Sequence, residues 1–245
     1  MTKIVLLGFL GVALIIGIYQ AIRITRLINA GKELARTTKA YEQHPSSPTS
    51  NVLVIGDSSA VGVGAGSPEE SVAGRLGVDH PAMAITNQAV NGRRVADLWQ
   101  NFNPPDTEHY DLVLIQIGGN DTLKLTDYGS LREQLPVVLE RASSIGNNVA
   151  LISSGNFVAA PLFPWPVDRY LGYRSKQVRD VFAELSQQAG VAYVDLYRST
   201  HETLSRENLD RDYAADGFHL SSRGYAYWYE QLVKTLQEDG IVLPK

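Results

Sequence analysis

Four short stretches of the sequence combine glycine with side chains that can carry out chemistry. They are Gly56-Asp57-Ser58-Ser59, the pair Asn91-Gly92, Gly118-Gly119-Asn120-Asp121, and the segment from Asp216 to His219. A serine becomes a nucleophile when a histidine accepts its proton and a carboxylate orients that histidine. Ser58, His219 and Asp216 supply these groups, and a spacing of three residues lets Asp216 reach one ring nitrogen of His219. These residue types therefore predict a serine nucleophile with its base.

Other interpretations of the same residues stay open. The bare amides of a glycine turn can hold a phosphate, but neither G-x-G-x-x-G nor G-x-x-x-x-G-K-[ST] is present around Gly62, Gly64 and Gly66. The serine elbow G-x-S-x-G is also missing, because Ala60 stands where its second glycine belongs. Taken alone, such a pair is more often structural, with Asp216 capping the last helix and His219 packed beside it.

Short apolar segments alternate with helical patterns along this part of the chain. The apolar segments are rich in Val, Ile and Leu, which is typical of a parallel sheet covered by helices on both faces. They predict five strands, over 51–56, 84–90, 111–118, 148–154 and 191–197. Ligands of such sheets bind beyond the carboxyl ends of the strands. The first three strands end at the glycine stretches, so we expect the candidate residues at one edge.

The intervening helices carry recognisable end signals. Ser67-Pro68-Glu69-Glu70 has the pattern of a capping box with proline at the first helical position. Further helices are predicted over 130–146 and over 173–190, the second ending at Gly190, and a last helix from about Ser222. We expect a three-layer α/β/α, flavodoxin-like domain with a five-stranded parallel sheet.

Together the four stretches resemble the blocks of the SGNH (GDSL) hydrolase superfamily of esterases and lipases. They occur in the order of that family and spread over nearly all of residues 51–245, although Ser59 replaces the leucine of the name-giving motif. The resemblance implies a triad of Ser58, His219 and Asp216, and an oxyanion hole from Ser58, Gly92 and Asn120. It also implies that no metal or organic cofactor is needed, and that Asp57 and Asp121 tie down their turns.

Substrate choice is expected to depend on the segment from Phe157 to Tyr173. It is long and aromatic, and its Phe157, Leu162, Phe163, Trp165 and Tyr170 are candidates for a wall around an acyl group. The alternative is a proline-stiffened loop that packs on its own domain. Arg93 and Arg94, next to Gly92, are candidates for binding a phosphate or carboxylate head group, or else are solvated surface residues.

The beginning of the chain differs from the rest. Ile4 to Ile22 holds 19 residues without a charge, which at about 1.5 Å per residue spans the hydrocarbon layer. We expect a retained membrane helix, with a cleaved signal peptide as the alternative, and divide the chain into an anchor (1–24), a juxtamembrane helix and linker (25–50) and a hydrolase domain (51–245). Lys and Arg are more frequent after the helix, as on a cytoplasmic flank, and the alternative is an extracytoplasmic domain.

Composition narrows the classes of function. A net charge of −4 gives no basic field for a nucleic acid, and the chain contains no cysteine for disulfides or thiolate chemistry. The sequence predicts a serine ester hydrolase that acts through an acyl-enzyme on a lipid-like or small acyl ester. The alternatives are a carbohydrate or peptidoglycan O-deacetylase, a tethered anion-binding domain without catalysis, and a metal-dependent phosphoesterase that uses Asp57, Asp121, Asp216 and His219.

Overall fold

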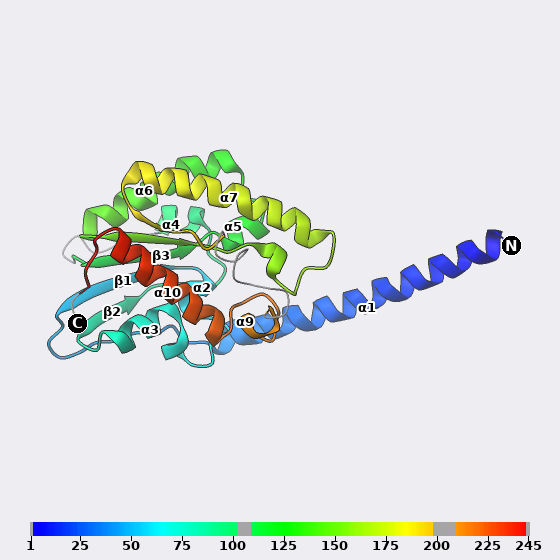
Figure 1. Cartoon of the computed structure of the whole chain (residues 1–245), viewed down its shortest axis with the longest axis horizontal. Coiled ribbons are helices and arrows are strands. Elements are labelled where there is room, and N and C mark those ends of the chain that lie inside the picture. The colour runs from blue at the N-terminus through cyan, green and yellow to red at the C-terminus, as the bar shows by residue number, and fades with distance from the viewer. Residues whose placement is uncertain (1, 102–108, 198–208, 244–245) are drawn as a thin grey trace.

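The computed structural model describes residues 2–101, 109–197 and 209–243 (Figure 1). Its centre is one sheet of five parallel strands in the order β2-β1-β3-β4-β5, which confirms the predicted fold class. The strands are β1 (Ser50–Gly56), β2 (Met83–Asn87), β3 (Leu112–Ile117), β4 (Val149–Ser153) and β5 (Ala192–Val194). The strand order reverses between β1 and β3, and this switch point opens a crevice at their carboxyl ends.

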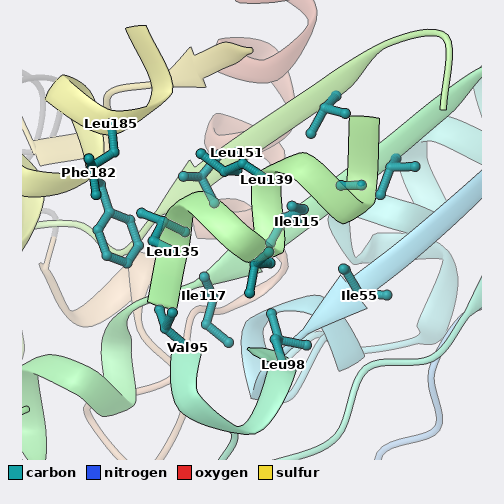
Figure 2. Packing of buried hydrophobic residues seen from close by; sticks show 14 of the residues in the cluster. Ile55, Val95, Leu98, Ile115, Ile117, Leu135, Leu139, Leu151, Phe182 and Leu185 are labelled. Carbon is teal, nitrogen blue, oxygen red and sulfur yellow. The ribbon is translucent and has the colours of Figure 1, made fainter. Parts of the chain in front are cut away.

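Successive residues of a strand point to opposite faces of the sheet, and here the residues on both faces are apolar. Helices therefore cover both faces. Leu53 and Ile55 of β1 belong to a core beneath α4, α6 and α7, which Figure 2 shows from close by. Val52 and Val54 belong to a second core beneath α3 and α10. The longer helices are α3 (Val72–Asp79), α4 (Val95–Asn101), α6 (Tyr128–Ile145), α7 (Val167–Ala189) and α10 (Ser222–Glu238).

The shorter helical segments lie near the carboxyl edge of the sheet or connect the longer elements. They are α2 (Ser58–Val61), α5 (Gly119–Leu123), α9 (Leu209–Asp212) and the 3₁₀ turns η1 (Pro68–Glu70) and η2 (Phe157–Ala159). α2 and α5 directly follow β1 and β3, so they place their first residues at the switch point.

Two predicted helix starts are wrong. The residues of the expected capping box form η1, Ser67 makes no capping bond, and α3 begins at Val72 with Ser71 Oγ accepting from the amide of Gly74 at 3.0 Å. Glu70 is engaged elsewhere, because its carboxylate accepts from Ser222 Oγ at 2.7 Å.

The second error concerns α7, which begins at Val167 rather than at Tyr173, so the expected loop is partly helical. Gly172 weakens the helical pattern of this part of the sequence, because glycine is unfavourable inside a helix. Here glycine is required, since a Cβ at this position would lie 2.1 Å from Val158 Cγ2 of the neighbouring turn.

A single long helix, α1 (Thr2–Thr37), precedes the sheet and projects from the domain at the end where the strands finish (Figure 1). Among the described residues it is the one helix long and apolar enough to cross a membrane, over Leu10–Thr37 with a mean hydropathy of 1.5. These properties fit an anchor or a signal sequence. The predicted linker after α1 lies along the sheet edge, where Gln43 forms an antiparallel bridge with Ile85 of β2.

Candidate active site

The turn after β1 places Ser58 at the switch point of the sheet. Gly56 has φ of +147°, and a Cβ there would lie 1.9 Å from the carbonyl oxygen of Gln116 on β3. Glycine is therefore needed for the close approach of the two strands. The chain turns sharply behind it, and Ser58 becomes the first residue of α2.

Asp216 and His219 come together with Ser58, as the sequence predicts. His219 Nε2 lies 3.0 Å from Ser58 Oγ, and His219 Nδ1 lies 2.6 Å from Asp216 Oδ2. The other carboxylate oxygen of Asp216 accepts from the backbone amides of Phe218 and His219, both at 3.0 Å. These bonds fix the carboxylate against the histidine ring, and the three side chains form a continuous chain from acid to hydroxyl.

The electrostatics of two buried carboxyl groups near Ser58 differ. Burial acts to raise the pKa of Asp216, but the bond and charge of His219 and the amides of Phe218 and His219 together lower it below its ordinary value. Burial dominates at Asp57 and raises its pKa, although Ser59, His219 and Asn120 act in the opposite direction. The lowered pKa favours the ionised form of Asp216, which suits it to orient a histidine and stabilise its charged form.

Asn120 lines the same cavity as Ser58, whereas Gly92 borders a separate recess. Asn120 is the second residue of α5, and its Nδ2 makes a long 3.4 Å contact with Asp57 Oδ2. Gly92 has φ of +81°, and its carbonyl accepts from Lys124 Nζ at 3.1 Å. Within the described ranges the backbone amides of Ser58 and Gly92 donate to no protein acceptor. Donors of this kind can stabilise an oxyanion.

The aspartates at the two glycine turns hold backbone segments in place. Asp57 Oδ1 accepts from the amide and hydroxyl of Ser59, at 2.9 and 2.8 Å. Asp121 is fully buried and accepts from the amide of Val95 at 3.1 Å, which fixes the segment that follows Gly92. Burial raises the pKa of Asp121 to about 6. No group of three His, Asp or Glu side chains in the described part of the chain could hold a metal ion.

A cavity of about 70 Å³ opens beside Ser58. Phe157, Phe163 and Phe218 pack together along it, with ring centroids 5.6 to 6.0 Å apart, and the ring of His219 lies edge-on to Phe218 at 5.0 Å. Of these residues, Phe157, Phe218 and His219 line the cavity wall directly. One side of the site is therefore aromatic and apolar.

Most candidates for substrate binding lie outside this cavity, whose lining includes Phe157 but not Leu162, Phe163, Trp165, Tyr170, Arg93 or Arg94. The side chain of Trp165 is 79% exposed, and Tyr170 is 53% exposed. Arg93 donates to the carbonyl of Gln88 at 2.9 Å and borders a separate polar recess of about 370 Å³. The other residues of that recess are Asn91, Gly92, Arg94, Asp97, Asn101 and Lys124.

Three residues that bear on the site have no assigned role in the sequence analysis. Phe218 lies in the cavity, and its place between Asp216 and His219 is the signal that would have found it. Gly64 has φ of +95°, and a Cβ there would lie 3.1 Å from the Cβ of His219. A Cβ at Gly31 of α1 would lie 2.8 Å from Asp216 Oδ2. No pattern in the sequence indicates this last contact, because 185 residues separate the partners.

Known structures share this fold. TesA is 20% identical, with a TM-score of 0.57, and the match covers 77% of this chain and 99% of TesA. The acetylxylan esterase Axe2 from Geobacillus stearothermophilus is 19% identical, with a TM-score of 0.56, over 80% of this chain and 96% of Axe2. A lipase/acylhydrolase from Enterococcus faecalis is 23% identical, with a TM-score of 0.58, over 80% and 99% of the two chains. No curated protein sequence matches significantly.

The model of one protein family matches most of the domain. This match extends over residues 54–227, more than half of the chain, and includes Ser58, Gly92, Asn120, Asp216 and His219. The family is that of GDSL-like lipases and acylhydrolases, as the resemblance of the four sequence blocks predicts, and the chain belongs to it.

Proposed function

We propose that the protein is a membrane-anchored serine ester hydrolase whose nucleophile is Ser58. The observation that carries this proposal is the chain of contacts from Asp216 Oδ2 through His219 to Ser58 Oγ, at 2.6 and 3.0 Å. Its support is the match to the acylhydrolase family over the same residues. The geometry is the one that a serine nucleophile requires.

The reaction begins when Ser58 Oγ attacks the carbonyl carbon of the ester and His219 Nε2 accepts the serine proton. The ionised Asp216 stabilises the resulting imidazolium. The oxyanion receives bonds from the amides of Ser58 and Gly92 and from the side chain of Asn120. His219 then returns the proton to the leaving alcohol, and the acyl group remains on Ser58. Water, activated by the same histidine, releases the acid and restores the serine.

The aromatic side of the cavity is the proposed acyl site, with Phe157 and Phe218 lining it and Phe163 packed against both. A cavity needs about 10–15 Å³ to hold one water molecule, so a cavity of about 70 Å³ has room for a few water molecules or for a short acyl group such as acetyl. This size supports a second candidate within the same chemistry, the removal of acetyl groups from a carbohydrate or peptidoglycan. A longer acyl chain would have to extend beyond this cavity.

The polar recess beside Gly92 is the proposed site of the leaving group. Arg93, Arg94 and Lys124 bring three positive charges to it, against the single carboxylate of Asp97. Cations of this kind favour an alcohol that carries a phosphate or carboxylate.

Helix α1 is the proposed membrane anchor, and the excess of Lys and Arg after residue 22 favours a cytoplasmic domain. An anchor stays in the mature protein, so the full chain is expected to remain with membranes after carbonate extraction. A mature protein that begins beyond residue 22 would show a signal sequence instead. Protease access in spheroplasts would determine on which side the domain lies.

The proposed reaction is tested with the full chain in detergent. We expect hydrolysis of p-nitrophenyl acetate and butyrate by the wild type, and loss of that activity in Ser58→Ala with the circular dichroism spectrum unchanged. Equal turnover by the two proteins would reject Ser58 as the nucleophile. A panel of esters from acetyl to dodecanoyl separates the acyl preferences, since activity confined to acetyl esters would favour the O-deacetylase. Loss of activity on addition of a chelator would instead favour the metal-dependent phosphoesterase.

A further inference from the structure

Helix α1 is fixed to the domain at the catalytic edge rather than tethered loosely. The Arg23 guanidinium donates to the carbonyl of Pro161, and Asn91 Nδ2 donates to the carbonyl of Ala35 at 2.8 Å. Between these contacts Gly31 lies against the carboxylate of Asp216. The half of α1 from residue 23 onward therefore has a set position next to the candidate triad.

These contacts fix the distance from the apolar part of α1 to the site. Arg23 is the first charged residue after the uncharged stretch, so on the anchor proposal it marks the membrane surface. The carbonyl that it binds belongs to Pro161, and the next residue, Leu162, donates its amide to Gly217 at 2.9 Å. Gly31, beside Asp216, is eight residues further along the helix, which is about 12 Å. The site thus lies close to the level where α1 leaves the apolar layer.

The chain segment that follows Pro161 exposes aromatic and apolar side chains. Trp165 is 79% exposed and Tyr173 61%, with Tyr170 at 53% and Val167 at 45%. Val167, Tyr170 and Tyr173 follow one another at intervals of three residues on the first turns of α7, so they occupy neighbouring positions on its surface. In Figure 1 this start of α7 lies at the end of the domain from which α1 projects.

An exposed cluster of this kind needs a partner, because soluble surfaces rarely group large apolar side chains. Trp and Tyr combine an apolar ring with a polar atom and are enriched at the level of the lipid headgroups. The cluster begins four residues after Pro161, whose carbonyl accepts from Arg23 of α1. A lipid surface is therefore the partner that fits its composition and its place.

We propose that the segment 165–173 is a second membrane contact, and that together with α1 it holds the opening of the Ser58 cavity against the bilayer. The substrate is then an ester carried by a molecule that is itself anchored in the lipid layer. This inference rests on the proposed hydrolase function and on α1 as an anchor. The cavity with Phe157 and Phe218 and the recess with Pro161 and Arg23 share Tyr213 in their walls. In this proposal such an ester therefore reaches Ser58 without leaving the membrane surface.

The membrane contact is tested with labels on the full chain in lipid vesicles. The chain has no cysteine, so Val167→Cys and Tyr173→Cys each carry a single polarity-sensitive fluorophore. Val78→Cys is the matched control, since Val78 is 58% exposed. It lies near the end of α3, just before the amino end of β2, and so away from the carboxyl ends of the strands. We expect nitroxide lipids to quench the labels at 167 and 173, with iodide quenching at least threefold weaker than at 78. Equal iodide quenching at all three positions, without quenching by nitroxide lipids, would overturn the proposal.

The source of the substrate is tested with two esters that share an acetyl group. The double variant Val167→Ser/Tyr173→Ser is expected to hydrolyse soluble p-nitrophenyl acetate at the wild-type rate. Hydrolysis of hexadecyl acetate held in the vesicles should fall about tenfold, because the opening no longer rests on the bilayer. Unchanged hydrolysis of hexadecyl acetate would overturn this part of the proposal. Failure of the hydrolase function itself would look different, since the wild type would then cleave neither ester while the labels still report the membrane contact.

Discussion

Substitution of Gly31 by alanine tests whether α1 takes part in positioning the candidate triad. The new Cβ would lie 2.8 Å from Asp216 Oδ2 and 3.5 Å from its Cβ. A side-chain oxygen can often move away from such a contact. Here three hydrogen bonds hold the carboxylate, one from the ring of His219 and two from backbone amides. We therefore expect the 2.6 Å bond between Asp216 and His219 to lengthen.

The size of the effect follows from that bond. A hydrogen bond to a charged group contributes about 1.5–3 kcal/mol, and each 1.36 kcal/mol changes a rate about tenfold. The kcat of Gly31→Ala should fall about 10- to 150-fold. The KM should change little, because neither Gly31 nor Asp216 lines the cavity. Stability should fall by at most about 2 kcal/mol, since the gain of about 1 kcal/mol from alanine inside a helix offsets part of the weakened hydrogen bond.

The assay is hydrolysis of p-nitrophenyl butyrate by the full chain in detergent, with kcat and KM measured separately. Gly17→Ala is the matched control, because it brings the same gain in helix propensity and its added Cβ meets nothing within 4 Å. Wild-type kcat in both variants would refute the reasoning and would mean that α1 yields to the added methyl group.

Three further predictions concern the residues around Ser58. Asn120→Ala should lower kcat about 10²- to 10³-fold with little change in KM, and a change mainly in KM would place Asn120 in substrate binding instead. Burial holds the pKa of Asp121 at about 6, above its ordinary value of 3.8, so the native state binds more protons than the unfolded state and stability falls as pH rises from about 4 to 6. Asp121→Asn should remove this fall in the free energy of unfolding, which amounts to at most about 3 kcal/mol for a shift of about two pKa units. Urea titrations of both proteins at pH 4.5 and 7.5 measure it. A wild type that gains stability over this range would contradict the assignment. Arg93→Gln should raise KM for an ester whose leaving group carries a phosphate while leaving the KM of p-nitrophenyl acetate unchanged, and equal effects on both substrates would remove Arg93 from the leaving-group site.

The sheet and the positions of the candidate residues were predictable because they depend on local sequence. Runs of Val, Ile and Leu define the strands, and glycine after a strand indicates a sharp turn. The parallel order then brings Ser58 and Asn120 to one edge, since both follow the carboxyl end of a strand. The spacing of Asp216 and His219 is equally local, and the structure has them in contact.

Features that depend on contacts between distant segments were not predictable in this way. The start of α7 was misplaced because Gly172 serves the packing against Val158, which the local pattern does not reveal. Trp165 was expected in the acyl wall from its type and its loop, yet the fold leaves it exposed while Phe157 and Phe218 line the cavity. The contact between Gly31 and Asp216 joins the two ends of the chain, so it appears only in the folded protein.

Covalent labelling of the full chain by a fluorophosphonate probe tests the central claim most directly. Such a probe reacts with a serine whose proton is taken by a neighbouring base. The account predicts one adduct per chain, located on Ser58 by peptide mass spectrometry, absent in Ser58→Ala and strongly slowed in His219→Ala. A wild type that acquires no adduct, or an adduct that persists in Ser58→Ala, would contradict it.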